Sequence, residues 1–142
     1  MHIDYAAKLI VSAWGLERTG SRITDAIREA VNGCQKERSL RRKGKFLWPP
    51  ELAEVSVRVP DPKCPESLRE IEHIPPEEIQ GAMLLIVRHT VGITLESLLV
   101  ETARLFGFER TGPNIRNLLV KVLEKMLNEG LVSKNGDSIG LG

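Results

Sequence analysis

The sequence predicts a mainly helical protein with small β-hairpins, and three observations lead to this fold class. The 142 residues are 42% hydrophobic and 27% charged, which suits one globular domain or two very small ones and disfavours disorder and coiled coil. Apolar residues recur at helical spacing in several segments, and short glycine-containing turn signals follow them. Most of this pattern occurs twice along the chain. We therefore expect a duplicated unit of helices that ends in a hairpin.

The repeat lies at an offset of 92 residues and needs no gaps. Residues 14–20, with the sequence WGLERTG, match residues 106–112, with the sequence FGFERTG. The apolar positions that follow stay in the same register as far as Leu47 and Ile139. A shared turn followed by a shared apolar register indicates two copies of one structural unit.

The second copy, residues 77–142, contains the whole unit. Apolar residues at helical spacing predict a first helix over Glu77–Thr90, after a Pro-Pro boundary. A short extended link follows, and its last residue, Thr94, can cap a second helix. Gly107 ends that helix and opens a tight connection.

A third helix follows this connection, with Pro113 in its first turn, where the amides have no intrahelical partner. Gly130 ends the helix, and Asn135-Gly136 predicts the turn of a β-hairpin. The order helix, helix, tight turn, helix and hairpin is that of a winged helix-turn-helix. The expected buried face of the third helix is Ile115, Leu118, Leu119, Val122, Leu123 and Met126.

The first copy, residues 1–48, repeats the pattern from its second helix onwards. Helices are expected over about Ile3–Trp14 and Ser21–Glu37, with a hairpin over Ser39–Trp48. The first helix of the unit would fall before Met1, so the first copy lacks it. Its apolar surface must then be covered by the linker, by a second chain, or by residues upstream in a longer parent protein. The expected inward face of its last helix is Ile23, Ile27, Ala30, Val31 and Cys34.

The linker between the copies, residues 49–76, is rich in proline. Val55, Val57 and Val59 alternate with polar residues, as a half-buried strand does. We expect one strand here, added beside the first wing, followed by irregular chain.

Three stretches of the sequence carry a resemblance to a known family. They are the two Gly-Leu/Phe-Glu-Arg-Thr-Gly turns, residues 44–50 with the sequence GKFLWPP, and residues 74–79 with the sequence IPPEEI. They resemble a domain of unknown function at the C-terminus of large bacterial and archaeal superfamily-one helicases, often beside a restriction-endonuclease-like domain. The resemblance covers nearly the whole chain. It implies an accessory domain of a DNA- or RNA-processing ATPase, with a helicase or nuclease polypeptide as partner and no ascribed catalytic residues.

The net charge of +1 conceals an uneven distribution along the chain. Residues 1–50 hold ten basic and five acidic residues, a net charge of +5. Residues 51–142 hold ten basic and fourteen acidic residues, a net charge of −4. The sum argues against a nucleic-acid partner, but its distribution indicates a basic surface on the first copy.

The basic residues of the first copy occur where a winged helix-turn-helix contacts nucleic acid. The start of the last helix faces the major groove, and the wing lies against phosphate or the minor groove. Arg22 could read a guanine edge or pair with a phosphate. A solvated hairpin, or a patch that docks on an acidic partner, is the alternative interpretation. The candidate nucleic-acid-binding residues of this copy are Arg18, Ser21, Arg22, Arg28, Lys36, Arg38, Arg41, Arg42, Lys43 and Lys45.

The second copy offers weaker candidates, which are Asn114, Arg116, Asn117 and Lys121. Its wing carries Lys134 and Asp137 where the first wing has a run of cations, which favours a structural or protein-facing role. The repeated Glu-Arg-Thr-Gly is interpreted as a determinant of the fold, because both copies keep it despite their opposite charge. Thr19 or Thr111 can cap the following helix, and Arg110 is a secondary DNA candidate beside Arg18.

No catalytic, metal or cofactor site is expected from the sequence. No Walker phosphate loop occurs. Residues 60–63, PDPK, resemble part of a nuclease site but are interpreted as a solvated turn. Cys34 is expected to pack in the core, and Cys64 has no partner at nucleophile spacing. The histidines, at positions 2, 73 and 89, give no zinc spacing.

These observations lead to one functional hypothesis and one alternative. The hypothesis is a cytoplasmic, non-catalytic accessory module that binds DNA or RNA, with duplex DNA favoured, within a helicase or nuclease system. The alternative is a protein-interaction or dimerisation module that docks a helicase body or a second subunit. No membrane partner is expected, because the longest apolar stretch, Ala82–Val87, is far too short to span a bilayer.

Overall fold

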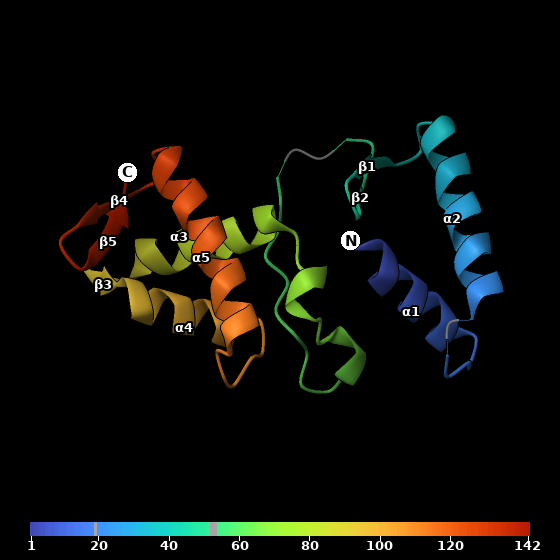
Figure 1. Ribbon diagram of the computed structural model, residues 1–142, viewed down its shortest axis with the longest axis horizontal. Coiled ribbons are helices and arrows are strands. Elements are labelled where there is room, and N and C mark those ends of the chain that lie inside the picture. Colours follow the sequence, from blue (N-terminus) through green and yellow to red (C-terminus); the bar gives the residue numbers. More distant parts are fainter. Residues whose placement is uncertain (19, 52–53) are drawn as a thin grey trace. The chain divides into compact units, whose positions relative to one another are not determined.

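The chain divides into two units, each mainly helical with a small antiparallel β-hairpin (Figure 1). Unit 1 comprises Met1–Glu54 and Glu72–Pro75, and unit 2 comprises Val55–Ile71 and Pro76–Gly142. The computed structural model describes residues 1–18, 20–51 and 54–142. Among these residues, no helix is long and apolar enough to cross a membrane.

Unit 1 contains two helices and a hairpin. Helix α1 (Ile3–Ala13) begins at the imidazole of His2, whose Nδ1 accepts the amide of Asp4 at 3.1 Å. A tight connection leads to α2 (Ser21–Lys36), and β1 (Arg41–Lys43) and β2 (Phe46–Trp48) then form the hairpin. The start of the chain lies along β2 through an isolated bridge between His2 and Phe46.

Unit 2 has the same elements in the same order, preceded by one more helix. The sheet has the antiparallel order β3-β5-β4, so β3 occupies the place that the start of the chain takes in unit 1. Thr94 caps α4 as predicted, since its hydroxyl accepts the amide of Ser97 at 3.2 Å. The elements are α3 (Pro76–His89), β3 (Ile93–Thr94), α4 (Leu95–Leu105), α5 (Pro113–Asn128), β4 (Val132–Asn135) and β5 (Ser138–Leu141).

The offset of 92 residues found in the sequence relates the elements of the two units. Helices α1 and α4 begin and end at equivalent positions, and so do α2 and α5. Gly44 and Gly136 both have positive φ angles, +60° and +62°, at the first position of a two-residue loop. The second loop is therefore Gly136–Asp137, one residue later than predicted, because glycine is favoured where this loop needs a positive φ.

The sequence predicts threonine caps for α2 and α5, and the structure can test the cap of α5. The N-cap residue of α5 is Gly112, so the prediction for Thr111 is wrong. Pro113 follows the cap and has no amide to be satisfied, which reduces the need for a capping side chain. The equivalent N-cap of α2 is Gly20, and Thr19 lies outside the described residues.

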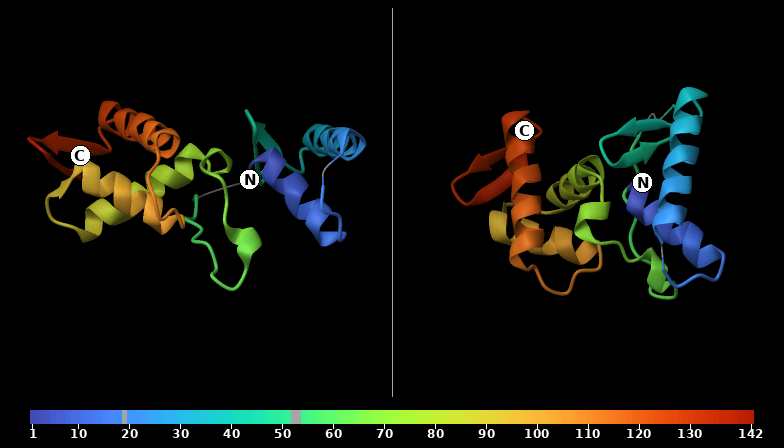
Figure 2. Two further views of the ribbon diagram at one scale, coloured as in Figure 1. Left: turned by 60° about the horizontal axis from the view of Figure 1, so that its bottom comes forward. Right: turned by 45° about the vertical axis from the view of Figure 1, so that its right-hand side comes forward.

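The core of unit 2 lies where α3 packs against both α4 and α5 (Figure 2). The predicted inner face of α5 is confirmed at Leu119, Val122, Leu123 and Met126, which are buried, whereas Ile115 and Leu118 are half-buried. The largest fully buried side chains of this core include Ile79, Met83, Leu98, Leu99, Phe106 and Ile139.

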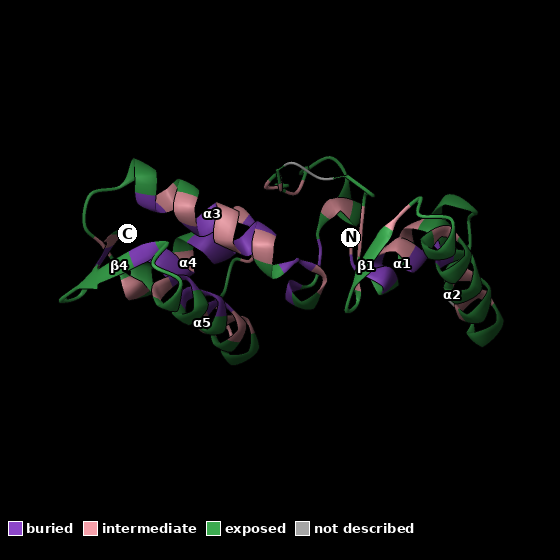
Figure 3. Cartoon of the chain, turned by 90° about the horizontal axis from the view of Figure 1, so that it is seen from above, coloured by how far each residue is buried: buried purple, intermediate pink, exposed green. Residues whose placement is uncertain are grey.

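Unit 1 has a thinner core. Figure 3 shows α2 largely exposed, and Val31 is the buried residue among its described side chains. Ala30, which was expected to face inward, is exposed, while Ile23, Ile27 and Cys34 are half-buried. The difference arises because the described residues of unit 1 include no helix equivalent to α3 to cover this face.

The strand expected over Val55–Val59 is wrong. Over the described residues 54–60 the chain forms no strand, and residues 55–60 belong to unit 2 instead of the first wing. The amide of Arg58 donates to the carboxylate of Glu78 on α3 at 2.8 Å, in place of a neighbouring strand. Val57 is half-buried close to Gly81 of α3, whereas Val59 is 59% exposed, so the alternating valines do not form one buried face.

Glu78 holds this segment against α3. Its carboxylate accepts two hydrogen bonds from Arg69, at 2.7 and 2.9 Å, and one from the Arg58 guanidinium at 2.9 Å. The side chains of Glu78 and Arg69 are 1% and 5% exposed. Burial alone would raise the pKa of Glu78, but the hydrogen bonds from Arg69 and Arg58 outweigh it and hold the pKa below its ordinary value. This buried ion pair, joined by two hydrogen bonds, therefore holds the segment that contains Arg58 and Arg69 against α3.

We predict that Glu78→Gln lowers the free energy of unfolding of unit 2 by about 3 kcal/mol, because it leaves the Arg69 charge buried without a counter-charge. Far-UV circular dichroism during urea unfolding measures this loss. Since the pKa of folded Glu78 is depressed, the stabilisation is present above the ordinary value of 4.5 and is lost as the pH falls through the folded pKa. The difference between wild type and variant should therefore shrink below about pH 4.5.

The two tryptophans provide an internal control for this experiment. Trp14 and Trp48 both belong to unit 1, so their fluorescence reports the unfolding of that unit. The fluorescence transition should stay where it is in the wild type. A variant that unfolds at the wild-type urea concentration by circular dichroism at neutral pH would show that the Glu78 pair does not stabilise unit 2.

Candidate nucleic-acid interface

A hollow of about 210 Å³ lies between α1, α2 and the hairpin of unit 1. Its apolar part comes from Ile3 and Ala7 of α1 and from Ile27 of α2. Four of its polar residues carry charge, and three of these are cations. The charged and polar residues that complete the lining are Asp4, Thr24, Arg28, Arg42 and Lys45.

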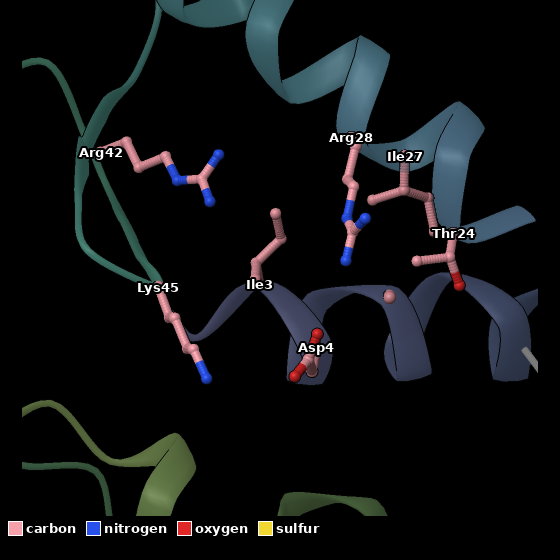
Figure 4. A pocket seen from close by; sticks show the side chains of 8 residues that line it. Ile3, Asp4, Thr24, Ile27, Arg28, Arg42 and Lys45 are labelled. Carbon is pink, nitrogen blue, oxygen red and sulfur yellow. The ribbon is translucent and has the colours of Figure 1, made fainter. Parts of the chain in front are cut away.

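The three cations reach the hollow from different elements (Figure 4). Arg28 points from α2 towards α1, Arg42 extends from β1, and Lys45 stands in the loop of the hairpin. All three side chains are exposed. The Nε of Arg42 donates to the carbonyl of Gly44 at 2.9 Å, which uses one of the five donors of its guanidinium and fixes its direction. The cationic donors of the hollow thus come from a helix, a strand and the hairpin loop.

The rest of the hairpin is also basic. Arg41 and Lys43 of β1 are exposed, and the Nε of Arg41 donates to the carbonyl of Pro49 at 3.3 Å. A second, more open hollow is lined by Arg38, Arg41 and Arg42, among other residues. Cationic side chains therefore surround the hairpin, as the sequence predicts for the first wing.

The start of α2 lies on the same unit. Ser21 and Arg22 occupy its first turn and are exposed, and the described residues of that turn include no acidic side chain. An exposed helix start without acidic residues suits an anion, because its amides and the helix dipole are both positive. Arg18 is exposed in the connection before it, and Lys36 is exposed at the end of the helix.

The equivalent surface of unit 2 differs in its charge and in the size of the side chains that occupy it. Arg116 stands at the position of Thr24 and donates two hydrogen bonds of 2.7 Å to Glu96, which stands at the position of Asp4. These hydrogen bonds lower the pKa of Glu96. The pairing competes with any phosphate for Arg116, and Leu99 replaces the small Ala7. Asn114, Asn117 and Lys121 are exposed on α5.

The structure also brings together three side chains that sequence reasoning did not connect. His2, Asp4 and His73 each offer an atom that could bind a metal, and these atoms lie within 4.8 Å of one another. His73 reaches this place because residues 72–75 belong to unit 1. Histidine spacing gave no signal, since this contact depends on how the chain returns to α1 and is not visible in a local motif.

Residues 60–63 form an exposed turn, in agreement with the interpretation from sequence. The carboxylate of Asp61 accepts the amide of Lys63 at 2.9 Å, and the described residues 61–66 are all exposed. Cys34 is half-buried on α2, and Cys64 is exposed beside Glu66.

Comparison with known proteins gives no relative of this chain. No protein-family model matches the chain, and no curated protein or solved structure matches it. A function must therefore be inferred from the residues and their arrangement.

Proposed function

We propose that the chain is a tandem winged helix-turn-helix whose first copy lacks its first helix, and that unit 1 binds nucleic acid, with duplex DNA favoured. The observation that carries this proposal is that Arg28, Arg42 and Lys45, from α2, β1 and the hairpin loop, all line one hollow. The proposed role is a non-catalytic accessory module of a helicase or nuclease system.

The order of elements supports the winged-helix interpretation. In unit 2 the chain runs α3, α4, α5 and then the β4-β5 hairpin, with β3 added to the sheet. Helix α5 corresponds to α2, so α2 takes the place of the recognition helix and β1-β2 that of the wing. Arg22 on α2 would then face the groove, and Arg28 and the hairpin cations would contact the phosphates.

The size of the hollow favours a polymer backbone over a small-molecule ligand. Its volume of about 210 Å³ lies below the range of roughly 300–1,000 Å³ that is usual for small-molecule sites. Exposed cations gain most from phosphates, because each contact releases condensed counterions from the nucleic acid. A charged backbone that passes between α2 and the hairpin would place phosphates near all three cations at once.

We predict that binding to a labelled duplex at low salt weakens when four cations of the hairpin are changed to Ala, namely Arg41, Arg42, Lys43 and Lys45. The reason is that these cations would release counterions from the phosphates. The slope of log K against log salt falls by about 0.9 for each phosphate contact that is lost, so the loss of four contacts should make the slope of the variant flatter by about 3.6. Fluorescence anisotropy at several salt concentrations, with duplex and single-stranded DNA, measures both effects.

Unit 2 provides a control of equal charge. Lys63, Arg88, Arg104 and Lys125 are exposed, and changing them to Ala removes the same four charges away from the proposed surface. The slope for this variant should differ from the wild-type slope by no more than about 0.9, the value of one phosphate contact. Equal slopes in the two variants would show that binding depends on the overall charge and not on the position of the cations. Wild-type protein that fails to bind duplex at low salt would refute the proposal.

A second candidate function, the docking of another polypeptide, is favoured by one specific observation. Trp14 and Leu16 at the end of α1 are 78% and 46% exposed, whereas Phe106, at the position of Trp14, is 1% exposed. In unit 2, α3 packs along α4 as an amphipathic helix, and the Arg69 guanidinium lies 5.9 Å from the centre of the Phe106 ring. The same inner face in unit 1 would receive an amphipathic helix of a partner polypeptide with apolar residues at the spacing of Ile79 and Met83.

A peptide with the sequence of α3, residues 76–89, tests this docking mode. Labelled peptide should bind the full chain, and Trp14→Ser should weaken the binding at least about tenfold, since a large aromatic side chain dominates such a contact. Val91→Ser is the matched control, because Val91 is fully exposed on unit 2. Equal binding by both variants would eliminate this face as the docking site, and sedimentation of a clean monomer would eliminate its closure by a second copy.

A further inference from the structure

Three side chains with metal-binding atoms meet at the start of α1. His2 is the N-cap residue, Asp4 lies in the first turn, and His73 approaches from residues 72–75 of the same unit. The rings of His2 and His73 have centroids 4.5 Å apart and planes tilted by 36°. His2 Nδ1 lies 3.9 Å from a carboxylate oxygen of Asp4. Two imidazoles and a carboxylate thus share one small volume.

The burial of the three residues differs in a way that suits an ion with an open position. His2 is 4% exposed, His73 is half-buried, and Asp4 is exposed. An ion could therefore enter from the side of Asp4 and keep a water molecule there. Neutral imidazole together with carboxylate is a donor set typical of zinc and related transition metals, whereas Ca²⁺ and Mg²⁺ prefer oxygen ligands.

The three ligand atoms would have to move closer together to bind one ion. Ligand atoms about 2.0–2.1 Å from a tetrahedral zinc ion lie roughly 3.3 Å from one another. The atoms of His2, Asp4 and His73 lie within 4.8 Å of one another, and the separation of 3.9 Å between His2 Nδ1 and Asp4 is too long by about 0.6 Å, within the reach of an exposed carboxylate. His73 is the last residue of a short 3-10 helix, Ile71–His73, and residues 74 and 75 after it form neither helix nor strand.

We infer that His2, Asp4 and His73 form a binding site for a divalent transition metal, with Zn²⁺ as the best fit. Binding through Nδ1 of His2 exchanges the hydrogen bond from the Asp4 amide for a metal bond. The ion ties residues 72–75 to α1, and with them the buried Ile74. A metal that joins segments so distant in sequence stabilises the folded unit, because the unfolded chain has no preformed site.

The test is calorimetric titration of ZnCl₂ into the full chain after treatment with a chelator. Both cysteines are first replaced by Ser, since Cys64 is exposed beside Glu66 and its thiolate could bind zinc by itself. We expect one ion per chain and a rise in the melting temperature with zinc. His73→Ala should weaken binding at least about tenfold, and binding should weaken from pH 7.5 to pH 5.5 as protons compete for the imidazoles.

Two further variants keep the test decisive. Asp4→Asn removes a ligand from an exposed position and should weaken binding even if His73→Ala perturbs the fold. His89→Ala is the matched control, because His89 is exposed at the end of α3 and bonds to the carbonyl of Leu85. Co²⁺ should give visible absorption bands that are lost with His73→Ala. Wild-type affinity in both His73→Ala and Asp4→Asn, or no binding of one equivalent, would overturn the inference.

Discussion

A pair of helices joined by a tight turn has one inner face, and that face is stable only when a third element covers it. In unit 2, α3 packs against both α4 and α5, and Leu98 on α4 and Leu119 on α5 are fully buried. In unit 1 the described residues provide smaller covers: the chain start along β2, and residues 72–75, whose His73 ring centroid lies 4.5 Å from that of His2 and 6.0 Å from that of Tyr5. The depth of each core follows from this difference, although the helices have equivalent bounds.

The two units use equivalent positions for opposite purposes. The pair of Glu96 and Arg116 in unit 2 stands where unit 1 has Asp4 and the short Thr24, and Leu99 stands where unit 1 has Ala7. Larger and mutually paired side chains fill the surface in unit 2, while shorter ones leave a hollow in unit 1. The arginines and the lysine around that hollow are exposed, and Arg42 is held by its hydrogen bond to the carbonyl of Gly44. Charge and shape together make unit 1 the one that is suited to an anionic partner.

The sequence predicted what depends on local pattern and on the repeat. The helix bounds, the cap at Thr94 and the inner face of α5 follow from turn residues and apolar spacing, and the structure confirms them. The local errors are the cap at Thr111 and the second hairpin turn, which lies one residue later than predicted. Other errors arose where partners are distant in sequence. The segment around Val57 forms no strand, because Arg58 bonds to Glu78 on α3 and Val57 lies close to Gly81 of the same helix. Ala30 is exposed for want of a covering helix, and the meeting of His2 with His73 depends on the path of the chain between them.

The thin core and the crowded cations of unit 1 have one common consequence. Like charges around a hollow repel one another, and a shallow core offers little buried area to offset this repulsion. A ligand that binds the folded form alone adds its binding free energy to stability. Phosphates at Arg28 and Arg42 would remove the repulsion, and an ion at His2 would hold Ile74 in place. Unit 2 has a buried ion pair and a third helix, so its folding does not need such help. We therefore expect bound phosphates or a bound ion to stabilise unit 1 more than unit 2.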